Sequence, residues 1–385
     1  MKEFFFEGVY LMSSERILRV GVIGCGGIAQ MMHLPFLRSL PTLFQIQAIS
    51  DLSPGLLQAI GQLYGVPAEQ QFTDFHDLVK QDLDAVLVLS GGTHAPPVIA
   101  AIETGKHVLV EKPLCYTLRE ANAVAEAAKR ANVKVMVAYM KRYDPGYRTA
   151  QGLLQGIQDV RYIQINTLHP AEDDYLGIHG ILRFHDIPTQ VLSLLTAAEE
   201  SLFDEAIGQV VPATLRKVYG NIVIGSMVHD MNALRGLMGE PDRVLFTDIW
   251  PSAEKEPSIT TVLAYGERTR VVLTWTYLEK LRNYFEEIAL MSPANRLRIQ
   301  FPSPYLRHFP TPIVFEGMEN GVFYEKRIIA SYNEAFKEEL LAFHRCVVEN
   351  IEPLTNIEDA RRDIEWLQRV FARHQPAGLS GEATH

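Results

Sequence analysis

The chain has 385 residues, with 36 Lys and Arg against 46 Asp and Glu, so its formal net charge at pH 7 is −10. This acidic balance argues against a nucleic-acid partner, and a hydrophobic content of 47% argues against intrinsic disorder. The length exceeds what one hydrophobic core usually serves, so we expect two domains. Three widely spaced cysteines favour a reducing, cytoplasmic setting, and no apolar run is long enough to predict a membrane span.

Short β-branched runs alternate with segments of helical periodicity from Ile17 onward, which is typical of a parallel sheet covered by helices. The expected strands are Leu18–Ile23, Phe44–Ser50, Ala85–Leu89, His107–Val110 and Lys134–Ala138. The expected helices are Ile28–Ser39, Pro54–Tyr64, Ala95–Glu103 and Leu118–Ala131. We therefore predict a doubly wound α/β domain of the Rossmann type over residues 16–142, preceded by an extension over residues 1–15.

The pattern changes beyond Pro145, where strands follow one another largely without helices. These strands are expected at Arg161–Leu168, Arg243–Trp250, Thr260–Tyr265, Arg270–Thr276, Phe285–Ser292 and Arg296–Phe301. Helices are expected at Ala213–Met238, Ala335–Glu349 and Asp359–Arg373, and residues 169–212 form an acidic, His-rich insertion in which we expect the substrate specificity to lie. We predict a second, α+β domain over residues 143–375, built on a mostly antiparallel sheet.

A glycine-rich turn directly follows the first strand and opens the first helix. The run is Gly24-Cys25-Gly26-Gly27-Ile28-Ala29, which matches the pattern G-x-G-x-x-G/A of dinucleotide-binding folds. The first glycine permits the tight turn, the second lets the backbone approach a pyrophosphate, and the small last residue allows the helix to pack on the strand. We therefore predict a dinucleotide at this turn.

An aspartate stands where such folds bind the adenosine ribose. Asp51 ends the second expected strand, 27 residues after Gly24, and its carboxylate can accept hydrogen bonds from ribose hydroxyls. A carboxylate there repels a 2′-phosphate, and the next residues, Leu52 and Ser53, supply no arginine to hold one. The sequence therefore favours NAD over NADP.

A lysine lies at the carboxyl end of the expected strand His107–Val110, on the edge where doubly wound sheets bind ligands. Lys112 follows Glu111 and precedes Pro113, and its ammonium could stabilise an alkoxide or polarise a carbonyl. Together with the glycine turn and Asp51, the runs GKHVLVEKPL and RYDP and the helix around His229 resemble the glucose-fructose oxidoreductase / inositol dehydrogenase / MocA family.

This resemblance implies a Rossmann domain, an open-faced antiparallel sheet, and an active site in the cleft between them. It also implies a homodimer or homotetramer packed through the second sheet. The implied substrate is a sugar, inositol or related polyol, and Lys112 would lie between it and the nicotinamide, with Glu111 beside the cofactor. His229 matches the family histidine that takes the hydroxyl proton.

The sequence departs from the family pattern at two places. Gly225 stands four residues before His229, where the family has an aspartate, and Asp230 is a candidate replacement that lies about 100° around the helix from His229. Leu89-Ser90-Gly91 occupies the place of a family Thr-Pro-Asn stretch near the nicotinamide ribose, where Ser90 and Gly91 can still offer backbone groups.

Three further positions complete the candidate site. His94 retains the family histidine that follows the Thr-Pro-Asn stretch, and His169 matches a substrate-contacting position of similar dehydrogenases. Arg142 either lines the cleft or forms a salt bridge at the domain junction. The acidic and histidine residues after His169 match no metal motif, so we expect no metal.

The predicted function is an oxidoreductase that transfers a hydride between NAD and a secondary hydroxyl, with Lys112 and His229 as its catalytic residues. Two alternatives stay open. One is a redox-neutral glycosidase or lyase that uses tightly held NAD, and the other is a non-catalytic, NAD-dependent sugar sensor, which the glycine at position 225 motivates.

Overall fold

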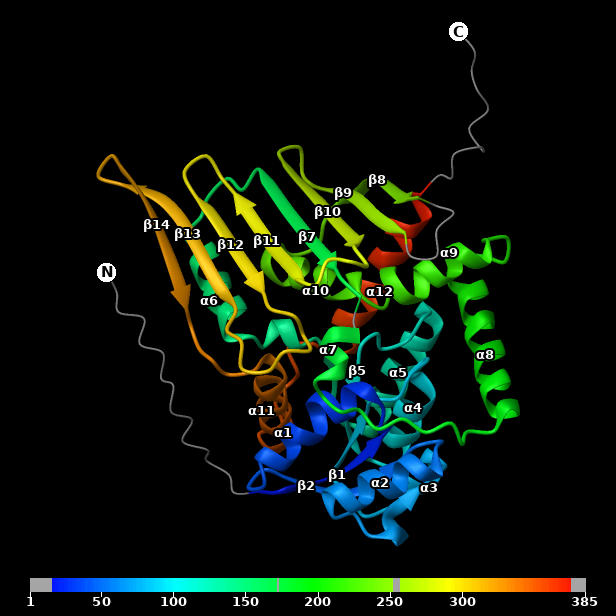
Figure 1. Cartoon of the computed structure of the whole chain (residues 1–385). Coiled ribbons are helices and arrows are strands. Elements are labelled where there is room, and N and C mark those ends of the chain that lie inside the picture. Colours follow the sequence, from blue (N-terminus) through cyan, green and yellow to red (C-terminus); the bar gives the residue numbers. More distant parts are fainter. Residues whose placement is uncertain (1–15, 172, 252–256, 375–385) are drawn as a thin grey trace.

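The computed structural model describes residues 16–171, 173–251 and 257–374, arranged around two sheets (Figure 1). The extension expected over residues 1–15 lies outside the described residues. No helix in the described ranges combines the length and the apolarity that a membrane crossing requires.

The first sheet has six parallel strands in the order β3-β2-β1-β4-β5-β6, the strand order of a Rossmann fold. The strands are β1 (Leu18–Ile23), β2 (Phe44–Ser50), β3 (Gln71–Phe72), β4 (Ala85–Val88), β5 (His107–Glu111) and β6 (Val135–Ala138). The helices are η1 (Ala29–His33), α1 (Leu34–Ser39), α2 (Pro54–Tyr64), η2 (Ala68–Gln70), α3 (Phe75–Leu78), α4 (Ala95–Glu103) and α5 (Leu118–Ala131). The five predicted strands form, with bounds that differ by at most one residue, and β3 and α3 are additions.

Local chemistry explains where these helices begin and end. Ser53 caps α2 by accepting a hydrogen bond from Leu56, and α2 ends at Gly65 in the left-handed conformation (φ 73°). Helix α5 begins with a capping box, in which the side chains of Thr117 and Glu120 each accept from the other's backbone N–H. These signals lie within a few residues of each other in the sequence, which is why the bounds were predictable.

The second sheet has eight strands in the order β14-β13-β12-β11-β7-β10-β9-β8, and only the β7–β10 pair is parallel. The strands are β7 (Tyr162–His169), β8 (Arg243–Trp250), β9 (Ser258–Tyr265), β10 (Thr269–Tyr277), β11 (Phe285–Met291), β12 (Arg296–Phe301), β13 (Pro312–Glu319) and β14 (Val322–Ile329). Strands such as β10 and β12 alternate buried and partly exposed residues, because one face packs on helices. The predicted fold class is confirmed, while β13 and β14 were missed.

The helices after β6 differ most from expectation. They are η3 (Met140–Arg142), α6 (Pro145–Leu154), α7 (Asp173–Gly177), α8 (Thr189–Ile207), α9 (Ala213–Lys217), η4 (Val218–Val223), α10 (Met227–Met238), α11 (Ala335–Val348) and α12 (Ile357–Ala372). The single helix predicted over Ala213–Met238 is wrong, because a π-helical turn and a break at residues 224–226 divide it. The longest element of the insertion is the 19-residue helix α8.

Two hydrophobic clusters hold the sheets in place. One packs α1, α2 and α11 against one face of the first sheet. The other starts from the opposite face, where α4 and α5 lie, and continues through α10 and α12 to the second sheet. The carboxyl ends of the first-sheet strands therefore meet α10 and the second sheet in fixed positions (Figure 1).

Candidate active site

The glycine turn has the geometry that a dinucleotide requires. Gly24 has φ +91°, and a Cβ there would lie 2.4 Å from the backbone nitrogen of Ser90. A Cβ on Gly26 would meet nothing within 4 Å, so its backbone faces open space that a phosphate could enter. Asp51 braces the turn, because it accepts hydrogen bonds from the backbone N–H groups of Cys25 at 2.8 Å and Ser53 at 2.9 Å. These residues fit an adenine dinucleotide.

Two cavities adjoin at the carboxyl edge of the first sheet. The smaller cavity has a volume of about 520 Å³ and the larger about 850 Å³. Seven predicted cofactor residues line the smaller cavity: Gly27, Ile28, Ser90, Gly91, His94, Glu111 and Lys112. The other four, Gly24, Gly26, Ala29 and Asp51, shape or flank the turn at one end without lining it. Lys112 and His229 line both cavities, so they lie where the two meet.

His94 has a bracing position between two loops. Its imidazole is buried, with Nδ1 2.6 Å from the carbonyl oxygen of Pro113 and Nε2 2.6 Å from that of Ser90. Both ring nitrogens are therefore engaged by the loops that follow β4 and β5. His94 therefore fixes the position of Ser90 relative to the turn at Lys112–Pro113.

Both the backbone N–H and the side-chain ammonium of Lys112 form hydrogen bonds. Its backbone N–H donates to Glu111 at 3.1 Å, and its ammonium donates to the carbonyl oxygen of Gly225 at 2.6 Å. Burial raises the pKa of Glu111, but the hydrogen bond from His33 at 2.8 Å and the nearby positive charges, including that of Lys112, together outweigh burial and leave that pKa below its usual value. An ionised Glu111 thus anchors the strand end that carries Lys112.

The glycine that departs from the expected pattern has a structural reason. A Cβ at Gly225 would lie 2.4 Å from the carbonyl oxygen of Asn221 and 2.8 Å from that of Gly220. The tightly wound backbone here leaves no room for an aspartate. The carbonyl of Gly225 instead supplies the acceptor for Lys112.

His229 lies at the junction of the two cavities. It lies in the first turn of α10, and its Nδ1 is buried without a hydrogen-bond partner. Burial, and after it the charges of Lys112 and Lys141, lowers the pKa of His229 well below its usual range. The imidazole is therefore neutral at pH 7 and can accept a proton.

A polar cluster beside His229 lines the larger cavity. Asp230 is buried, with Thr167 Oγ1 at 3.4 Å and Lys141 Nζ at 4.0 Å. Lys141 also forms an ion pair with Glu286, which accepts a hydrogen bond from Tyr284 at 2.6 Å. Burial and the nearby Glu286 raise the pKa of Asp230 well above its usual range, so Asp230 can be protonated and donate.

Sequence reasoning missed Lys141, Tyr284 and Glu286. Lys141 did carry a signal, because a lysine three residues after β6 lies at the same ligand-binding edge as Lys112. Glu286 and Tyr284 carried none, since only the pairing of β11 with β7 places Glu286 opposite Thr167, and Tyr284 directly precedes β11.

His169 lies in the larger cavity, as expected of a substrate-contacting residue. Its ring centroid lies 5.4 Å from that of Trp275 and 5.7 Å from that of Tyr284, and its Nδ1 is 2.9 Å from the carbonyl oxygen of Pro170. Aromatic rings thus form part of the wall of the larger cavity.

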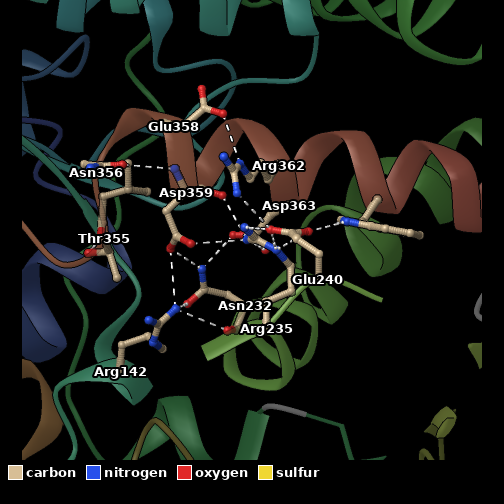
Figure 2. A network of polar contacts seen from close by, with 12 residues as sticks. Arg142, Asn232, Arg235, Glu240, Thr355, Asn356, Glu358, Asp359, Arg362 and Asp363 are labelled. Carbon is tan, nitrogen blue, oxygen red and sulfur yellow. Dashed lines mark hydrogen bonds and ion pairs between the residues drawn. The ribbon is translucent and has the colours of Figure 1, made fainter. Parts of the chain in front are cut away.

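Arg142 lines neither cavity, so the cleft-lining alternative is not what the structure shows. Its guanidinium lies 3.3 Å from Asn232 and 3.5 Å from Asp359, in a buried polar network (Figure 2). The network joins α10 to α12, where Arg235 pairs with Asp363 at 2.6 Å. Arg142 therefore forms the junction salt bridge that was the other interpretation, because η3 turns its side chain toward α12.

The insertion contributes to both cavities. Leu176, Ile181 and Arg183 line the smaller cavity, and Thr196, Glu199 and Phe203 of α8 line the larger. Within the described ranges, no group of three or more His, Cys, Asp and Glu side chains is arranged to hold a metal ion.

Comparison with known proteins agrees with this geometry. Residues 18–139 match a family model described as an oxidoreductase family with an NAD-binding Rossmann fold. A myo-inositol 2-dehydrogenase of Thermotoga maritima is 27% identical over 292 residues, which cover 70% of this chain and 86% of that protein. An inositol 2-dehydrogenase of Saccharopolyspora erythraea is 39% identical over 139 residues, which cover 36% of this chain and 40% of that protein.

Solved structures share the two-sheet fold. A 3-ketoreductase of Actinomadura kijaniata, solved with NADP, has a TM-score of 0.71 at 18% identity and covers 94% of this chain and 98% of its own. A scyllo-inositol dehydrogenase of Lactobacillus casei has a TM-score of 0.66 at 18% identity, with coverages of 94% and 97%. The architecture therefore extends over nearly the whole chain.

Proposed function

This chain belongs, through the nucleotide-binding fold of residues 18–139, to the glucose-fructose oxidoreductase / inositol dehydrogenase / MocA family, and on that premise we propose that it is a dehydrogenase of sugars or polyols. The reaction would move a hydride between a nicotinamide cofactor and the carbon of a secondary hydroxyl. The observation that carries the proposal is the meeting of Lys112 with a neutral His229 at the junction of the two cavities.

The bound nicotinamide would supply the hydride acceptor. His229 would take the hydroxyl proton, since its pKa keeps the imidazole neutral at pH 7. The ammonium of Lys112 would stabilise the negative charge that develops on the substrate oxygen. To do so it would either give up its hydrogen bond to the carbonyl of Gly225 or donate to that carbonyl and to the substrate oxygen together. Glu111 would keep Lys112 in place.

The lining of the larger cavity favours a polyhydroxylated substrate. Asp230 and Lys141 offer a donor or acceptor and a cation, and Asn221 and Ser226 add further polar groups. Trp275 with the other rings offers an apolar wall for the C–H face of a sugar or inositol. The named inositol dehydrogenases among the relatives support this substrate class.

We further propose NAD as the preferred cofactor, because Asp51 directly follows β2 and neither of the next two residues, Leu52 and Ser53, is an arginine. Free, buried thiols at Cys25, Cys115 and Cys346 support a reducing, cytoplasmic setting. A homodimer or homotetramer packed through the second sheet is supported by exposed apolar side chains on its outer strands, such as Phe246 and Phe323.

The test is nicotinamide absorbance when the purified protein and NAD meet inositols, hexoses, sugar acids and glycosides, with the variant Lys112→Met in parallel. Reduction of NAD with one class of substrate, lost in the variant, is the expected result. Substrate turnover on retained NAD without net reduction would indicate the redox-neutral alternative. NAD and sugar binding with no turnover in any assay would indicate the sensor.

A further inference from the structure

A strap, defined as residues 178–188, joins α7 to α8 and crosses the first-sheet domain (Figure 1). The side chain of Gln30 holds it by two hydrogen bonds to the backbone of Leu182, one donated at 3.1 Å and one accepted at 2.8 Å. Ile181 reaches the glycine turn, where its Cδ1 would lie 3.9 Å from a Cβ on Gly27. The strap therefore lies along the nucleotide-binding edge, although its sequence carries no nucleotide motif.

Asp186 of the strap docks at the N-terminus of α2. One carboxylate oxygen accepts from the hydroxyl of Ser53 at 2.5 Å and the other from the backbone N–H of Gly55 at 2.7 Å. These two bonds lower the pKa of Asp186, with His185 adding a smaller effect, so the carboxylate is ionised. The first turn of α2 has no donor left, because Pro54 has no N–H and the N–H of Leu56 donates to Ser53.

This docking point adjoins Asp51. The backbone N–H of Ser53 donates to Asp51 and its hydroxyl donates to Asp186, so the two carboxylates flank one residue at the end of β2. Rossmann folds bind the adenosine ribose at this position. Ribose hydroxyls can donate hydrogen bonds to carboxylates. A 2′-phosphate instead requires hydrogen-bond donors and positive charge, and a helix N-terminus that no carboxylate occupies would supply N–H donors and partial positive charge.

Resting on the proposed nicotinamide-dependent function, we propose that Asp186 is a cofactor-selectivity residue. Its carboxylate fills the anion site at the N-terminus of α2, so that NAD binds and the 2′-phosphate of NADP is rejected. Arg183 of the strap does not offset this charge, because Arg183 lines the smaller cavity, whose lining does not include Asp186.

Asp186→Ala tests the proposal through binding, without any substrate. Dissociation constants of NADH and NADPH are measured by calorimetry for the wild type, Asp186→Ala and Asp186→Asn. The matched control Glu103→Gln removes the same charge at the C-terminal end of α4, far from the carboxyl edge of the sheet. We expect Asp186→Ala to bind NADPH about tenfold more tightly, because it removes a like charge and frees two donors.

The Asn variant is expected to give part of that gain, since it loses the charge and keeps an acceptor for Gly55. Binding of NADH should change little in both variants, and Glu103→Gln should keep the wild-type ratio of the two constants. If both Asp186 variants still bind NADH and keep the wild-type ratio of the NADH and NADPH dissociation constants, the role of Asp186 in selectivity is wrong and the proposed function is unaffected. A wild type that prefers NADPH contradicts it too, while a wild type that binds neither nucleotide also contradicts the proposed function.

Discussion

Lys112→Met removes the ammonium at the junction of the two cavities and keeps a side chain of similar length. That ammonium now donates to Gly225 at 2.6 Å, so it is fixed before substrate arrives. Loss of one preorganised donor to a developing oxyanion costs about 10²- to 10³-fold in kcat, or about 2.7–4 kcal/mol. We expect a loss of at least that size, because the lost donor also carries a charge.

The same variant should shift the pH profile. The charge of Lys112 helps to lower the pKa of His229, so its removal lets that pKa rise toward the usual value, while burial and Lys141 still oppose the rise. His229 must be neutral to accept the proton. The acid limb of kcat/KM for oxidation is therefore expected to move to higher pH.

The assay is kcat and kcat/KM across the pH range with the best substrate of the panel, together with NADH binding by calorimetry. Lys106→Met is the matched control, because Lys106 precedes the same strand at its opposite end. An unchanged kcat in Lys112→Met would refute the catalytic assignment. A loss of NADH affinity that accounts for all of the lost activity would show that Lys112 acts in nucleotide binding.

Three other perturbations test separate parts of the structure. Asp51→Ala should weaken NADH binding about tenfold and reduce the preference for NADH over NADPH, because it removes the acceptor for the ribose and the hydrogen bond to the glycine turn. Calorimetry measures both dissociation constants, and an unchanged NADH-to-NADPH ratio would contradict this prediction. Gly225→Ala should lower the free energy of unfolding by about 1–3 kcal/mol and reduce kcat, because the added Cβ would clash with the carbonyl oxygen of Asn221. Equal urea unfolding midpoints for the variant and the wild type would show that the backbone has room for a side chain at this position. Glu339 is fully buried with both carboxyl oxygens unpartnered, and burial, with Glu111, raises its pKa well above the usual value. The stability that the protonated Glu339 provides is fully present below the ordinary pKa of Glu and is lost as the pH rises from that value to the raised pKa. Glu339→Gln should therefore gain about 1–3 kcal/mol in the free energy of unfolding over the wild type between about pH 5 and 8. Unfolding free energies of the two proteins that change in parallel with pH would disprove this.

The sequence by itself determined the first-sheet domain. Its strands β4 and β6 are short apolar runs buried on both faces, and its helices α2 and α5 are capped at their N-termini by Ser53 and Thr117. The glycine turn, Asp51 and Lys112 each follow a strand directly, so their common edge could be inferred from chain order alone. Each of these signals depends on residues close together in the chain, so it can be interpreted from the sequence without a structure.

Only the tertiary structure decided how the site is completed. The bond from Lys112 to Gly225, the cluster around Asp230, and the docking of Asp186 join residues distant in the chain. For Arg142 the sequence left two interpretations open, and the ion pair with Asp359 of α12 decided between them. The break before α10 could not be inferred, because the residues around Gly225 keep an apolar helical pattern. Periodicity reports which face of a segment is buried, whereas the partner on that face is set by the packing of the whole chain.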